Sequence, residues 1–73
     1  NNQERAQSIL KKVTLLKNKV KLADELERAA EDLETLIELA QEGENVSEEI
    51  SETLSYLDEK IQDAEIRTIL SGE

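Results

Sequence analysis

The stretch VKLADEL, residues 20–26, shifts the phase of an otherwise regular apolar pattern. On either side of it, apolar residues recur at alternating steps of three and four, as they do along one face of a helix. Within it, two steps of three follow each other, and such a slip overwinds a coiled coil locally. We therefore expect one helix of about residues 3–41, with a bend or a change of packing partner at Val20–Leu26. Its apolar positions are Ala6, Ile9, Val13, Leu16, Val20, Ala23, Leu26, Ala29, Leu33, Leu36 and Ala40.

The segment EGENVS, residues 42–47, interrupts this helix. Gly43 suits the left-handed position after a helix C-terminus, and Asn45 or Ser47 can cap the helix that follows. After a loop of about 42–46, a second helix is expected over about 47–70. Because a short loop joins antiparallel neighbours, the sequence predicts an all-α, antiparallel hairpin of two long, coiled-coil-like helices. Residues 1–73 would then form a single fragment of a helical bundle domain. The apolar face of the second helix carries Ile50, Leu54, Leu57, Ile61, Ala64 and Thr68.

The hairpin register predicts which charges oppose each other and which apolar side chains lack a cover. The opposed charges are Arg28 with Glu59, Glu27 with Lys60, and Lys19 and Lys21 with Glu65 and Asp63. The second helix is the shorter, so the N-terminal part of the first one overhangs it. The overhang carries the apolar stripe Ala6, Ile9, Leu10 and Val13. Because that stripe needs a partner, a homodimer through the exposed seam of the first helix is possible.

The composition argues against catalysis. The chain has neither His nor Cys, and its two glycines lie too far apart for a phosphate-binding loop. Carboxylate pairs such as Glu31 with Glu34, or Glu34 with Glu38, are typical of solvated helix faces. We therefore expect no catalytic, cofactor-binding or metal-binding residues and no cofactor.

The net charge of −9 is unevenly distributed: residues 1–21 carry +5 and residues 22–73 carry −14. The basic stretch could contact phosphates through Lys12 and Lys19. It has no aromatic residue for base stacking, however, and lysines commonly border a buried seam. We therefore expect no direct nucleic-acid binding. No apolar run approaches the roughly 20 residues that span a bilayer, so no membrane partner is expected either.

The chain opens with QERAQSILKKVTLLKNKV and closes with LDEKIQDAEIRTILSGE. These two ends resemble the N-terminal domain of the bacterial peptide chain release factor 2 family, which belongs to the class I release factors. The opening QERAQSILKKVTLLKNKV matches a Glu-Arg-Ala-Gln-like segment of that family at Glu4, Arg5, Ala6 and Gln7. The closing LDEKIQDAEIRTILSGE matches a Leu-Ser-Gly-Glu-like junction at Glu65, Leu70, Ser71, Gly72 and Glu73. The resemblance covers essentially the whole chain, and the Ser-Gly-Glu ending favours type 2 over type 1. Since no methionine opens the chain, we expect both ends to be cuts within a longer protein.

The resemblance implies a cytoplasmic protein of translation termination. The full-length factor would enter the ribosome, recognise UGA or UAA through a tripeptide, and promote peptidyl-tRNA hydrolysis with a Gly-Gly-Gln loop. Neither element occurs in these 73 residues. The resemblance therefore implies an accessory domain that docks and positions the factor. Its partners in the full-length protein would be the GTPase-associated region of the ribosome and possibly the type 3 release-factor GTPase. The alternative is a structural coiled-coil module whose activity is self-assembly.

Overall fold

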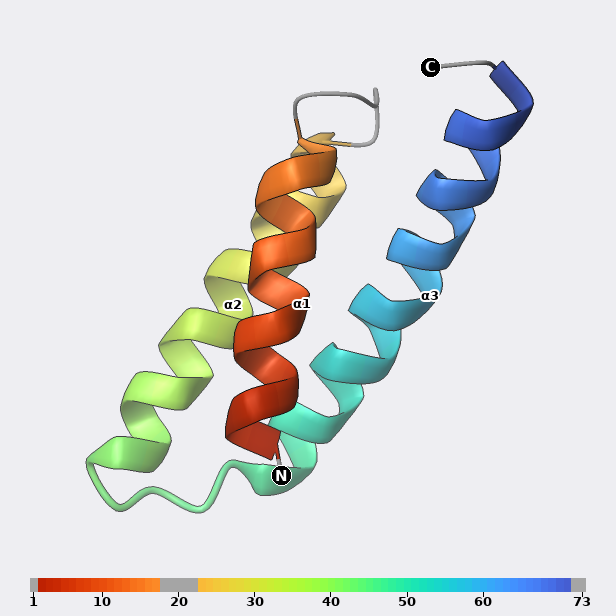
Figure 1. Cartoon of the computed structure of the whole chain (residues 1–73). Coiled ribbons are helices and arrows are strands. Elements are labelled where there is room, and N and C mark those ends of the chain that lie inside the picture. Colours follow the sequence, from red (N-terminus) through yellow and green to blue (C-terminus); the bar gives the residue numbers. More distant parts are fainter. Residues whose placement is uncertain (1, 18–22, 72–73) are drawn as a thin grey trace.

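The computed structural model describes residues 2–17 and 23–71, and the all-α prediction is confirmed for them. Three helices follow one another: α1 (Asn2–Leu16), α2 (Ala23–Gln41) and α3 (Ser47–Ser71). In Figure 1, α1 and α3 run in the same direction and α2 runs in the opposite one. Each helix contacts the other two. The result is a bundle 44 Å long with cross-section dimensions of 18 and 15 Å.

The prediction of a two-helix hairpin was wrong. The expected helix of about 3–41 is replaced by two helices, α1 and α2, which lie antiparallel and in contact (Figure 1). The phase slip at Val20–Leu26 coincides with the interval between them, although residues 18–22 lie outside the described part of the chain. A change of packing partner at the slip was one of the two expected outcomes, but α1 proves to pack against α2 itself as well as against α3.

Burial of the apolar stripe of α1 explains why three helices form in place of two. Ala6, Ile9 and Val13 are buried in the common core. Full burial of a Val or Ile side chain contributes about 1.5–3 kcal/mol. Breaking a helix forfeits only about 0.3 kcal/mol for each residue, given propagation constants of about 1–1.6. Folding α1 back is therefore favourable, and the overhanging seam that suggested a homodimer is not exposed.

The core runs along the axis of the bundle and draws on all three helices. Its buried members are Ala6, Ile9, Val13, Leu26, Ala29, Ala30, Leu33, Ile50, Leu54, Leu57, Ile61 and Ala64. Leu10, Leu16, Leu36, Ile37 and Val46 pack against its edge. Nearly all the buried positions are those of the predicted apolar stripes. The side chain of Thr68 lies outside the described residues.

The middle helix, α2, has an apolar face wide enough for two neighbours. Adjacent residues Ala29 and Ala30 are both buried, and the adjacent pair Leu36 and Ile37 packs against the core. Neighbours along a helix point about 100° apart, so one of each pair faces each flanking helix. Such a doubled stripe is typical of a bundle, whereas a two-stranded coiled coil has a narrower seam.

The turn after α2 closes in a Schellman motif. The Gly43 amide donates to the Ala40 carbonyl at 3.0 Å, and the Glu44 amide donates to the Leu39 carbonyl at 3.0 Å. Gly43 has φ of 95°, in the left-handed region. At the start of α3 the Val46 carbonyl accepts a bond from the Ile50 amide at 2.9 Å. Val46 therefore holds the N-cap position, between the two residues expected there.

A Gly43→Ala substitution is expected to lower the free energy of unfolding by about 1–2 kcal/mol, the cost of a left-handed conformation for a residue with a Cβ atom. No atom lies within 4 Å of the position that this Cβ would take, so the effect comes from the backbone alone. Urea denaturation followed by circular dichroism measures it. Gly43→Asn is the control and should cost less, because Asn tolerates this conformation. An equal loss for both variants would contradict this explanation.

Candidate interaction surface

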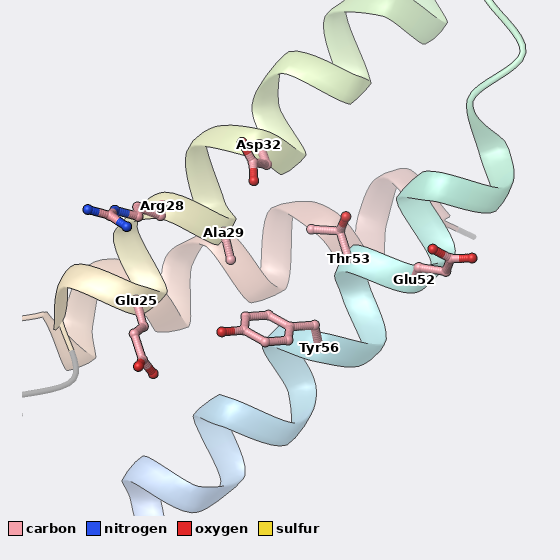
Figure 2. Close-up of a pocket in the computed structure, with 7 residues that line it drawn as sticks. All are labelled: Glu25, Arg28, Ala29, Asp32, Glu52, Thr53 and Tyr56. Atoms are coloured by element: carbon pink, nitrogen blue, oxygen red, sulfur yellow. The ribbon is translucent and has the colours of Figure 1, made fainter.

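One candidate site is an open hollow of about 370 Å³ between α2 and α3. Figure 2 shows four lining side chains on α2 and three on α3. Ala29 and Thr53 are short, so the two helices leave space between them at this level. The lining residues are Glu25, Arg28, Ala29, Asp32, Glu52, Thr53 and Tyr56.

Tyr56 forms one wall of this hollow, and its ring extends from α3 towards α2 in Figure 2. The side chain is 43% exposed, at the edge of the interface between α2 and α3. The Lys60 ammonium lies 5.6 Å from the ring centroid and 3.4 Å from a Glu25 carboxylate oxygen. A cation at this distance interacts favourably with the face of an aromatic ring. Arg28 also lines the hollow, so two cations, Arg28 and Lys60, lie close to its carboxylates.

Ion pairs cross all three helix interfaces among the described residues. Arg5 joins α1 to Asp58 of α3, Lys17 joins α1 to Glu27 of α2, and Lys60 joins α3 to Glu25 of α2. The Lys17 pair spans 3.3 Å. Exposed pairs contribute only about 0–1 kcal/mol each, so their main effect is to favour one register of the helices.

These contacts correct the charge pairs expected from the hairpin. Glu27 pairs with Lys17 and not with Lys60, because the returning α1 brings its own cation to α2. Lys60 pairs with Glu25, which lies two residues, or about half a helical turn, before the expected partner Glu27. Lys19 and Lys21 lie outside the described residues, so their expected pairing is not tested. Asp63 forms a pair at 3.4 Å with Arg67 on its own helix.

The basic stretch divides into paired and exposed residues. Arg5 and Lys17 belong to ion pairs between helices, whereas Lys11 and Lys12 are exposed on α1. Leu15, which lies four residues after Lys11 and three after Lys12, is 65% exposed. In the basic stretch, Lys17 thus stabilises the bundle, whereas Lys11 and Lys12 face solvent.

A second surface, the α1–α2 groove, comprises three adjoining hollows with volumes of about 160, 260 and 160 Å³. They share lining residues: Ile37 lines the first and second, and Leu10 and Glu34 line the second and third. The groove thus follows the two helices from Gln3 to Lys17 on the α1 side. The carboxylate pairs Glu31–Glu34 and Glu34–Glu38 lie along its α2 side.

Residues 2–17 and 23–71 carry neither a metal-binding cluster nor a membrane-spanning helix. This part of the chain contains no group of three or more His, Cys, Asp or Glu side chains placed to hold a metal ion. None of its helices combines the length and the apolar character needed to cross a bilayer.

The fold and these surfaces define a small, highly charged three-helix bundle with grooves on at least two of its sides. The chain is homologous over its whole length to part of bacterial peptide chain release factor 2. It is 39% identical over 74 residues to the Shewanella baltica protein, 40% over 76 to that of Aeromonas salmonicida, and 35% over 77 to that of a Mycobacterium species. These alignments cover at least 99% of this chain but only 20–21% of each relative.

The resemblance seen in the sequence is therefore confirmed as homology, for a segment about one fifth as long as the curated relatives. No protein-family model matches the chain, and no solved structure matches it significantly.

Proposed function

We propose that this chain is the N-terminal accessory domain of a translation termination factor, which in its full-length form acts at UGA and UAA stop codons in the cytoplasm. The observation that carries the proposal is the homology to release factor 2 along at least 99% of the chain. The domain docks and positions the factor on the ribosome and does not catalyse release. Its partners are the GTPase-associated region of the ribosome and the type 3 release-factor GTPase.

The physical character of the bundle supports a role in docking. The described helices present charged, grooved faces on a rigid core, and such faces suit contacts with another macromolecule. Neither a Gly-Gly-Gln loop nor a stop-codon tripeptide containing Pro or Phe occurs in the 73 residues. Self-assembly, the alternative, was motivated by an exposed stripe on α1, of which Ala6, Ile9 and Val13 are buried and Leu10 is half-buried.

The 73-residue chain by itself is expected to release no peptide from ribosomes programmed with UGA. Release requires groups that reach both the codon and the peptidyl-transferase centre, and these groups would belong to the rest of the factor. The measurement is release of a labelled peptide, with intact Shewanella baltica release factor 2 as the positive control. Stop-codon-dependent release by the chain alone would contradict the proposed function.

A chimera tests the docking role directly. The chain replaces the homologous segment of the Shewanella baltica factor, and an unrelated three-helix bundle of equal length replaces it in a matched control. The first chimera should keep the KM for ribosomes close to that of the intact factor, whereas the control should raise KM and leave kcat largely unchanged. That pattern is expected when a contact contributes equally to ground-state and transition-state binding. Equal KM values for the two chimeras would exclude docking by this segment.

A further inference from the structure

The α1–α2 groove has an apolar floor. Leu10 and Ile37 are half-buried there and pack against the core, and Ala30 lies buried further along. Small Ala30 keeps the floor low beyond Leu10, in the third hollow, whereas Leu10 and Ile37 together line the second. A large apolar side chain from outside could therefore contact Leu10 and Ile37 without displacing either helix.

The two rims of the groove differ in charge. On the α2 side stand three exposed glutamates, Glu31, Glu34 and Glu38, at helical spacing. Facing them on the α1 side are the uncharged residues Gln3, Gln7 and Thr14, with Lys17 at the end of the groove. The Thr14 hydroxyl donates to the Leu10 carbonyl at 3.1 Å.

No lysine or arginine of the described residues forms an ion pair with the glutamates of this acidic rim. Lys17, the cation of the groove, pairs with Glu27 at 3.3 Å, and none of the three rim glutamates takes part in an ion pair there. In the α2–α3 hollow, by contrast, Arg28 stands among the lining residues and Lys60 pairs with Glu25. The α1–α2 groove thus combines an apolar floor with three glutamates that form no ion pair among the described residues.

We propose that the α1–α2 groove binds a basic amphipathic helix of a partner protein. Its apolar side chains would contact Leu10 and Ile37, and its lysines or arginines would pair with Glu31, Glu34 and Glu38. This is the helix-in-groove mode of recognition, with charge complementarity along one rim. The α1 side from Gln3 to Lys17 spans roughly 21 Å at 1.5 Å per residue, which matches a partner helix of about four turns. The proposal concerns the groove itself and does not require a role in termination.

Titration of the ¹⁵N-labelled 73-residue chain with a synthetic peptide tests this binding mode. The probe has about 14 residues of Leu, Ala and Lys, with leucines on one helical face and lysines flanking them. Saturable amide shifts are expected around Leu10, Ala30 and Ile37, and the affinity should fall as NaCl is raised. A second peptide carries glutamate at every lysine position and should not bind. Largest shifts on the α2–α3 face, or equal binding of both peptides, would overturn the proposal.

Two matched variants separate the groove from general attraction to an acidic protein. Replacing Glu31, Glu34 and Glu38 by Gln should weaken binding by roughly tenfold, since three exposed ion pairs are lost. The control changes the net charge equally on exposed positions of α3: Glu52→Gln, Glu59→Gln and Glu65→Gln. It should weaken binding less than about threefold, because distant charges are screened. Similar losses in both variants would overturn the proposal. Melting curves check that each variant is folded.

Discussion

A Val13→Asp substitution is expected to unfold the whole chain at neutral pH. The Val13 side chain is 1% exposed and belongs to the core formed by all three helices. A carboxylate at this position would lose its hydration without gaining a partner, which costs several kcal/mol in real proteins. The total stability of a 73-residue domain is about 4–11 kcal/mol, at 0.05–0.15 kcal/mol per residue. The penalty therefore removes most of the free energy of unfolding.

Thermal melts by circular dichroism, combined with sedimentation, measure this effect and separate the bundle from the hairpin. In the two-helix hairpin, Val13 would lie on the part of the first helix that extends beyond the second. Asp at that position would disrupt a dimer and leave the melting temperature almost unchanged. Leu15→Asp is the matched control, because it makes the same change at a position that is 65% exposed. It should shift stability by no more than about 0.5 kcal/mol, as surface substitutions usually do. A folded, monomeric Val13→Asp protein would show that α1 does not pack as described.

A Leu33→Ala substitution is expected to lower the free energy of unfolding by about 2–5 kcal/mol. Leu33 is fully buried in α2, the helix that contacts both neighbours, so its loss leaves a cavity that only partial relaxation can fill. Urea denaturation gives the free energy, and an unchanged slope would show that unfolding remains two-state. Ile66→Ala is the control, because Ile66 is 51% exposed on α3 and should cost far less. Comparable losses at the two positions would place Leu33 outside the core.

Much of the core could be predicted from spacing alone. Ile9 and Val13 in α1, Leu33 in α2, and Leu54 and Leu57 in α3 were all assigned to apolar faces, and all are buried. Burial follows from helical periodicity whether a helix has one neighbour or two. The number of helices could not be obtained in this way, because a phase slip is compatible with a bend as well as with a break.

Two signals in the sequence do favour the break. Asp24 and Glu25 stand in the first turn of α2, where the helix dipole stabilises negative charge, and acidic residues at such a position indicate a helix start. The doubled stripe of α2, seen at Ala29 and Ala30, indicates a second neighbour. The hairpin prediction used neither signal, because it assigned one apolar residue to each helical turn and therefore only one buried face to the helix.

The candidate surfaces could be predicted only in part. The exposed carboxylates at Glu31, Glu34 and Glu38 followed from the sequence, since they lie off the apolar stripe. Their position opposite the uncharged Gln7 did not follow, because it depends on α1 lying beside α2. The partner of Glu27 was missed for the same reason.

The sequence by itself determined that the chain is helical, which side chains form most of its core, where α2 ends, and to which proteins it is related. These properties depend on local periodicity, on Gly43 and on identities along the chain. Only the tertiary structure decided that α1 folds back, that most of its stripe is covered within the chain, and that an acidic rim faces a mostly uncharged one. These features depend on contacts between residues far apart in sequence. Burial of Ile9 and Val13 favours the bundle by more than an unbroken helix could recover.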